Sequence, residues 1–77
     1  MTSLDDALIR AQRRRLPEPP IRRLLRERAG LSQYELAAAI GVSRPAVTRW
    51  EAGQRSPRGD LAERYADALD RLSVVRP

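Results

Sequence analysis

The sequence predicts an all-α fold, a compact helical bundle made of five short helices. Apolar residues recur at spacings of three and four along most of the 77 residues, which is the period of amphipathic helices. Serine and proline stand where these segments begin, and glycine stands where several of them end. No alternating pattern typical of a strand competes, except that Val74 and Val75 could form a short edge strand.

The first predicted helix, Ser3 to Arg15, forms an N-terminal unit with the proline-rich linker that follows it. Ser3 and Asp6 have the spacing of a capping box. The apolar residues of this segment share one helical face: Leu4, Ala7, Leu8 and Ala11. Prolines between residues 16 and 20 stop the helix and stiffen the chain. We therefore divide the sequence into an N-terminal helix with its linker (1–20), a helical domain (21–72) and a short tail (73–77).

The second and third predicted helices have clear end signals. The second runs from about Pro20 to Ala29, because proline suits a first helical position and Gly30 suits the residue after a helix. The apolar residues expected on its inner face are Ile21, Leu24 and Leu25. The third begins at Ser32, which has a capping-box partner in Glu35, and it ends at Gly41. Its inner face carries Leu36, Ala37 and Ile40.

The fourth predicted helix begins two residues after the third one ends. Ser43 is a good N-cap residue, and Gly53 closes this helix. Its inner residues are Val47 and Trp50. The fifth helix is predicted from about Pro57 to Leu72, with Ser56 as its cap. An apolar stripe runs along it: Leu61, Tyr65, Leu69 and Leu72.

The composition restricts the chemistry of the protein. The chain has no cysteine and no histidine, which excludes disulfides, thiolate zinc sites and imidazole catalysis. We therefore expect no enzyme activity, no cofactor and no metal ion. No apolar run approaches the roughly 18 residues of a membrane span, and the N-terminus lacks a signal peptide pattern. We expect a cytoplasmic protein, associated with the nucleoid and without a membrane partner.

Positive charge is concentrated in the middle of the chain. The net charge is +5, and all 15 basic residues are arginines. Residues 21–58 hold eight arginines against three glutamates, whereas residues 59–77 are net acidic. The guanidinium fork matches phosphate groups and guanine edges. This distribution favours a nucleic acid as the partner.

The segment from Ser32 to Glu51 has the pattern of a helix-turn-helix. Two short helices meet at Gly41-Val42-Ser43, and so short a turn makes them cross steeply. Gly41 can adopt a positive φ that other residues resist. Ala37 is small enough for a close approach of the two helices, and Val42 can fill the space under the turn.

This region resembles the Cro and phage-repressor family of helix-turn-helix regulators, also called the Xre family. The resemblance covers about Ile21 to Leu69 and would make the fold four family-like helices plus an extra N-terminal one. The matching residues are Leu31-Ser32-Gln33, Glu35-Leu36-Ala37, Gly41-Val42-Ser43, Val47, Trp50-Glu51, Gly53, Pro57 and Tyr65-Ala66-Asp67-Ala68-Leu69.

The resemblance implies a sequence-specific regulator of transcription that binds double-stranded DNA. Its recognition helix, Ser43 to Glu51, would lie in the major groove. The residues implied to face the bases are Arg44, Pro45, Thr48 and Arg49. Either arginine can form paired hydrogen bonds with guanine. Pro45 departs from the amide-bearing residues of several relatives, and its ring can only touch a thymine methyl or shape the helix start.

Other positions match the family's backbone contacts and its internal ion pair. The residues implied to contact phosphates are Gln33, Ser43, Arg55 and Arg58. Ser43 is at least as well explained as a plain N-cap. The resemblance also implies a structural ion pair between Arg26 and Glu51, the alternative being two independent surface charges. Trp50 is expected in the core rather than stacked on DNA.

The flanks leave the partners open. The family often continues with another helix and often forms dimers there, but this chain has only Asp70 to Pro77 after the matched region. The N-terminal helix could cover the bundle, pair with a second copy or bring Arg13, Arg14 and Arg15 to phosphates. Val74 and Val75 could also join two subunits of a homodimer.

Two other functions compete with the DNA-binding regulator. One is the antitoxin of a toxin–antitoxin pair, in which the same core binds DNA and a flank holds the toxin as a protein partner. The other is a protein-interaction module that binds no DNA. The four arginines at positions 44, 49, 55 and 58 argue against this last alternative.

Overall fold

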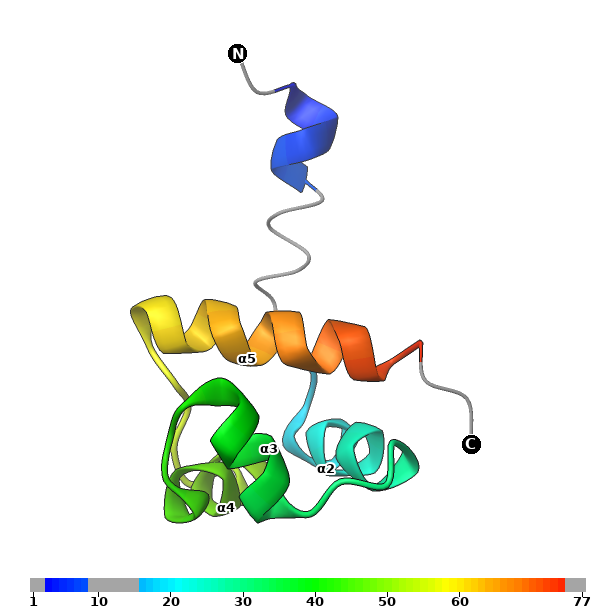
Figure 1. The fold of residues 1–77 in the computed structure, drawn as a ribbon. Coiled ribbons are helices and arrows are strands. Elements are labelled where there is room, and N and C mark those ends of the chain that lie inside the picture. The colour runs from blue at the N-terminus through cyan, green and yellow to red at the C-terminus, as the bar shows by residue number, and fades with distance from the viewer. Residues whose placement is uncertain (1–2, 9–15, 75–77) are drawn as a thin grey trace.

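The computed structural model describes residues 3–8 and 16–74, and these residues form helices and connecting turns (Figure 1). The long helices are α2 (Pro19–Arg28), α3 (Gln33–Ile40), α4 (Arg44–Ala52) and α5 (Gly59–Leu72). Residues 4–8 are helical as well. No strand occurs in the described residues, so the all-α prediction is confirmed there. No described helix is long and apolar enough to cross a membrane.

Local signals set the ends of α3 and α4 as predicted. The Oγ of Ser32 accepts a hydrogen bond from the backbone N–H of Glu35 at 3.0 Å, and the Glu35 carboxylate accepts one from the Ser32 N–H at 2.9 Å. Ser43 caps α4 more loosely, with a distance of 3.4 Å. Gly41 and Gly53 end the two helices with φ of 88° and 74°, a conformation that side chains with a Cβ resist. The tight turn between α3 and α4 therefore follows directly from its residues.

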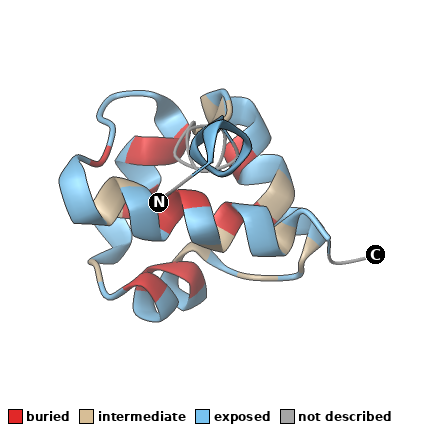
Figure 2. Cartoon of the chain, turned by 90° about the horizontal axis from the view of Figure 1, so that it is seen from above, coloured by how far each residue is buried: buried red, intermediate tan, exposed pale blue. Residues whose placement is uncertain are grey.

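The core lies where α3, α4 and α5 cross, and Figure 2 shows buried residues interspersed with exposed ones along the helices of the bundle. It consists of Leu36, Ala37, Ile40, Val47, Trp50, Tyr65 and Leu69. Val42 packs against it from the turn, as predicted. The ring centroids of Trp50 and Tyr65 lie 4.8 Å apart, and the ring planes are inclined by 40°. Trp50 is thus a core residue.

Helix α2 turns a different face inward from the one predicted. Ile21 and Leu24 are exposed, whereas Arg22 and Arg26 are buried. Both guanidinium groups find acceptors inside the molecule, Arg22 on a backbone oxygen and Arg26 on the carboxylate of Glu51. A buried charge that is paired and hydrogen-bonded is tolerated. The prediction of an apolar inner face for Ile21 and Leu24 is therefore wrong, although α2 itself is present.

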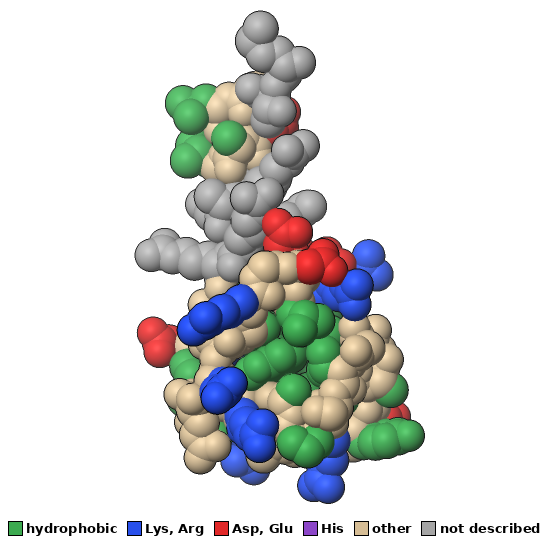
Figure 3. All heavy atoms as spheres, turned by 90° about the vertical axis from the view of Figure 1, so that its left-hand side faces the viewer, with side chains coloured by type: hydrophobic (Ala, Val, Ile, Leu, Met, Phe, Trp, Pro, Cys, Tyr) green, Lys and Arg blue, Asp and Glu red, His purple; other side chains and the backbone are tan. Residues whose placement is uncertain are grey.

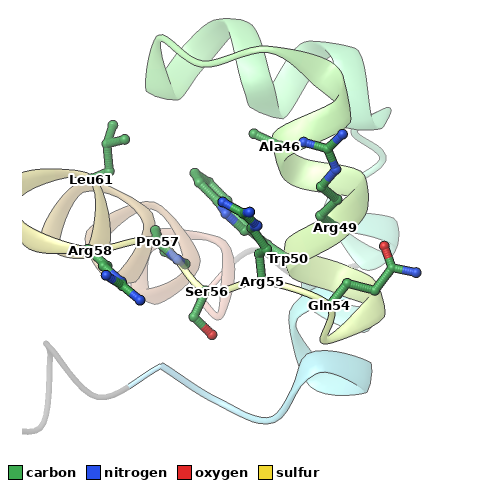
Figure 4. Close-up of a pocket in the computed structure, with 9 residues that line it drawn as sticks. All are labelled: Ala46, Arg49, Trp50, Gln54, Arg55, Ser56, Pro57, Arg58 and Leu61. Carbon is green, nitrogen blue, oxygen red and sulfur yellow. The ribbon is translucent and has the colours of Figure 1, made fainter.

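Helix α5 starts two residues later than predicted. Pro57 is buried and precedes the helix, and Arg58 is extended, with φ of −125° and ψ of 155°. Ser56 is exposed and caps nothing. Pro57 lines a groove together with Trp50 and Leu61, where the loop meets the two helices (Figure 4).

In the N-terminal flank, Leu16 packs against the core, whereas the leucines of residues 4–8 do not. Leu4 and Leu8 are 75% and 53% exposed, so residues 4–8 bury neither leucine against the bundle. The rest of the first predicted helix, with Ala11 and the arginines at 13–15, lies outside the described residues. Val74 is exposed and in a turn rather than in an edge strand, and Val75 lies outside the described residues.

Candidate nucleic-acid interface

Helix α4 separates its residues into a buried face and an exposed face. Val47, Trp50 and Glu51 are buried. The four residues implied to face bases are all exposed: Arg44, Pro45, Thr48 and Arg49. Spacings of three and four put residues on one side of a helix, so these four form a continuous outer face. We call it the outer face of α4.

The arginines of the described residues fall into two groups. One group has hydrogen bonds or ion pairs with other described residues: Arg22, Arg23, Arg26, Arg64 and Arg71. The guanidinium groups of the second group have none within residues 3–8 and 16–74: Arg28, Arg44, Arg49, Arg55 and Arg58. Four of these five lie on α4 or on the loop that follows it. A guanidinium without an internal acceptor keeps its donors available for an external anion.

Three of the unpaired arginines line a groove of about 770 Å³ between α4, the loop of residues 54–58 and the start of α5 (Figure 4). We call it the α4–α5 groove. Its apolar lining consists of Ala46, Trp50, Pro57 and Leu61, and the basic side chains are Arg49, Arg55 and Arg58. Figure 3, which views the side where α5 begins, shows apolar side chains in a hollow with basic ones beside and below it. The groove therefore combines an apolar floor with a cationic rim.

Behind the outer face, the ion pair predicted between Arg26 and Glu51 is present and buried. The Nε of Arg26 donates to one carboxylate oxygen of Glu51 at 2.6 Å, and its Nη2 donates to the other at 2.9 Å. The Nη1 of Arg26 donates to the backbone oxygen of Leu31 at 2.8 Å. This two-point geometry ties α2 to α4 and directs the remaining guanidinium donor toward the start of α3.

The electrostatics of this pair favour both charged forms. Burial acts to raise the pKa of Glu51, but hydrogen bonds from Arg26 and Gln33 outweigh it and hold that pKa below its usual value. The hydrogen bond to Glu51 raises the pKa of Arg26 further. The pair therefore stays ionised at neutral pH.

Gln33 connects this buried pair to the outer face of α4. Its Nε2 donates to Glu51 at 3.1 Å, and its Oε1 accepts a hydrogen bond from the hydroxyl of Thr48 at 2.7 Å. The amide nitrogen has a second hydrogen for an external acceptor such as a phosphate. The Thr48 hydroxyl also lies 3.2 Å from the backbone oxygen of Arg44, so its single hydrogen is used within the protein.

Gln33 also lies beside unpaired positive charge. A shallow depression at the start of α3 is lined by Gln33, Ser32, Tyr34 and Arg44, among others. The first residues of α3 line this depression, and a helix N-terminus favours an anion. The structure thus brings together Gln33 and Arg44, which the sequence places 11 positions apart.

Arg22 is an important residue that the sequence reasoning missed. It is buried, and its Nη1 donates to the backbone oxygen of Trp50 at 3.0 Å. Its Nε donates to the backbone oxygen of Pro17 at 2.8 Å. The available signal was its position four residues before Arg26, because this spacing places both on one helical face.

The described residues contain no cluster of three or more acidic side chains placed to hold a metal ion.

Comparison with known proteins gives two matches. The sequence model of the family described as helix-turn-helix matches residues 23–75. A protein of Methanothermobacter thermautotrophicus, described as an uncharacterized HTH-type transcriptional regulator, is 44% identical over 49 residues, which cover 64% of this chain and 71% of that protein. No solved structure matches the chain significantly.

Proposed function

The chain belongs to the helix-turn-helix family, and we propose that it is a sequence-specific regulator of transcription that binds double-stranded DNA. Helix α4 is the recognition helix in this proposal, and its outer face enters the major groove. The similarity to a protein described as a transcriptional regulator supports the assignment.

Arg44 and Arg49 are the base-reading residues of the proposal. Both are exposed and neither has an acceptor among the described residues, so each can offer two parallel donors to a guanine. Thr48 and Pro45 contribute apolar surface, which suits a thymine methyl group. Thr48 is also oriented from within, because its hydroxyl is held by Gln33.

Backbone phosphates are contacted on both sides of this helix. On one side, Gln33 and the start of α3 hold a phosphate through the free amide hydrogen of Gln33. Ser43 retains its hydroxyl hydrogen for a second phosphate, because in the cap it acts only as an acceptor. On the other side, Arg55 and Arg58 contact the next phosphates. Such contacts position the protein without reading sequence.

One observation carries the proposal: the arginines without internal partners are concentrated on α4 and on residues 54–58, whereas those of α5 are paired with aspartates. A structural role would explain paired arginines. Unpaired arginines that are concentrated on one surface are explained by binding to an external polyanion such as DNA.

Binding to labelled duplexes that span the protein's own promoter tests this function. The parent is compared with Arg44→Ala and Arg49→Ala at two salt concentrations, and Arg71→Ala serves as the charge-matched control because Arg71 lies at the far end of α5. We expect one preferred duplex, a loss of preference in the two α4 variants and little change in the control. Equal affinity for all duplexes, unaffected by either α4 variant, would refute base reading.

A further inference from the structure

The α4–α5 groove has a cationic rim and an apolar floor, and a phosphate backbone would interact only with the rim. Its three cations, Arg49, Arg55 and Arg58, suit any anion. The part of its apolar lining that is still partly exposed is Ala46 and Leu61, because Trp50 and Pro57 are buried, and exposed apolar surface is best covered by apolar side chains. The groove therefore fits a segment that carries leucines and carboxylates together.

Residues 3–8 are such a segment within the same chain. Leu4 and Leu8 are exposed and four positions apart, so they share one side of the helical turn. Asp5 and Asp6 are exposed and have no side-chain partner among the described residues. The turn is capped, since the backbone N–H of Asp6 donates to the Oγ of Ser3 at 3.1 Å. An isolated helix this short is marginal in water, and packing on a surface would stabilise it.

The chain enters the bundle at the edge of this groove. A Cβ placed on Gly53 would lie 3.3 Å from the Cγ of Pro19, so the start of α2 runs directly beside the first residues of the loop. Figure 4 shows this part of the chain passing below Ser56 and Arg55. The hydrogen bond from Arg22 to the oxygen of Pro17 keeps the entry point in place.

The length of the tether allows contact. Ten residues separate Leu8 from Pro19, and an extended chain spans roughly 3.3 Å per residue. The tether therefore gives residues 3–8 a reach of roughly 33 Å from Pro19, which lies beside Gly53, the residue before the loop that lines the groove. A short tether also gives an effective concentration on the order of millimolar, which favours a contact within one chain over the same contact between chains.

We propose that residues 3–8 dock into the α4–α5 groove of their own chain. Leu4 and Leu8 cover the floor at Ala46 and Leu61, and Asp5 and Asp6 face the arginine rim. The acidic segment then occupies the place of DNA phosphates, so docking and DNA binding compete. This competition rests on the proposed function, whereas the docking does not.

The charges of the chain predict a weak contact. Exposed carboxylate–guanidinium pairs contribute little and are screened by salt. Four arginines follow at positions 10 and 13–15, and their charge opposes an approach to the cationic rim. We therefore expect partial docking that salt releases and that DNA displaces.

A spin label on the N-terminal segment tests docking without DNA. The chain has no cysteine, so Thr2→Cys provides a single attachment site, and the broadening of backbone and indole N–H signals is measured by NMR. We expect broadening of residues 54–58 and of the Trp50 indole, the only tryptophan. Val74→Cys carries the control label on the opposite flank. The effect should largely disappear at high salt and in the Leu4→Ser/Leu8→Ser variant of the labelled chain.

Three outcomes would overturn the proposal. Equal broadening in the parent and the Leu4→Ser/Leu8→Ser variant would show that the segment is near the groove only because it is tethered, without docking through its leucines. Broadening that passes between labelled and isotope-enriched chains in a mixed sample would assign the contact to a second copy. Leu36, Ala39 and Ala68 line a second groove, between α3 and α5, and broadening centred on them would place the segment there instead.

DNA binding gives the second readout. Asp6→Asn should bind duplex DNA a few-fold more tightly than Asp70→Asn, which has the same net charge. Equal affinities of the two variants would refute competition. If the parent binds no DNA, the proposed function fails while the spin-label result still decides the docking.

Discussion

The Nη1 of Arg22 lies 3.0 Å from the backbone oxygen of Trp50 and joins α2 to the end of α4. The last four carbonyl groups of a helix have no partner within it, and a positive charge near them is favourable. The same guanidinium lies 6.0 Å from the ring centroid of Tyr65. Arg22 thus fixes the end of the proposed recognition helix against two other helices.

Replacing Arg22 should destabilise the whole fold. Arg22→Met keeps an aliphatic chain but removes both hydrogen bonds to backbone oxygens, each of which is a bond from a charged donor worth about 1.5–3 kcal/mol. Urea unfolding should show a loss of at least this size. Arg23→Met is the matched control, because Arg23 is exposed and its pair with Glu27 contributes about 0.5 kcal/mol or less. Equal losses in the two variants would contradict the assigned role.

Removing one partner of the buried ion pair should cost more than removing both. Glu51→Leu leaves Arg26 buried without its carboxylate, with an expected loss of about 3–5 kcal/mol in the free energy of unfolding. Arg26→Met/Glu51→Leu should recover much of this loss, since an apolar pair of similar volume is tolerated. Chemical denaturation of the three proteins measures both effects, and a double variant less stable than the single one would count against this account.

The same pair makes stability depend on acid. The pKa of Glu51 lies below its ordinary value of 4.5 in the folded protein, so the unfolded chain takes up this proton first as the pH falls. The stabilisation is therefore complete above about pH 4.5 and is lost as the pH drops through the lower folded pKa. The Arg26→Met/Glu51→Leu variant should lose less stability over this acid range than the parent does.

Tyr65 should tolerate the loss of its hydroxyl. This group is buried and has no hydrogen-bond partner among the described residues. Tyr65→Phe should therefore leave the free energy of unfolding unchanged or raise it at neutral pH, although removing a typical hydrogen bond costs about 1 kcal/mol. A clear loss of stability in thermal unfolding would show that the hydroxyl is satisfied after all.

Alkaline pH gives a second signature of Tyr65. Burial raises its pKa from 10.0 to about 12. As the pH rises, the unfolded chain releases the Tyr65 proton before the folded protein does. The contribution of protonated Tyr65 to the free energy of unfolding is therefore complete below pH 10 and is lost as the pH rises toward 12. The Tyr65→Phe variant should lack this part of the alkaline loss.

Arg55 and Arg58 should affect DNA binding differently from the residues of α4. Because each is proposed to contact a phosphate, replacing either arginine with alanine should weaken binding to every duplex by a similar factor. Each replacement should also reduce the slope of log affinity against log salt by about 0.9. Titrations at several salt concentrations measure this slope. A selective loss on the preferred duplex alone would instead indicate base reading by these arginines.

Local chemistry explains which parts of the fold were predictable. The segment from Ser32 to Gly53 was predicted closely, because its caps, its tight turn and its apolar spacing all act within a few residues. The ion pair of Arg26 with Glu51 was implied only by family resemblance, since nothing local links residues 25 positions apart. The roles of the outer residues of α4 remain predictions.

The sequence by itself determined the all-α architecture, the two capped helices and the concentration of arginines in the middle of the chain. Only the tertiary structure decided which arginines are buried and which stay unpaired. The burial of Arg22 depends on the carbonyl end of α4, which lies against α2 and supplies the acceptor. The start of α5 likewise follows from the tertiary structure, in which Pro57 is buried before the helix begins. The physical reason is that burying an arginine is favourable only where the guanidinium finds acceptors, and burying a proline only where its ring finds packing partners. Distant parts of the chain supply both, so the local sequence does not specify them.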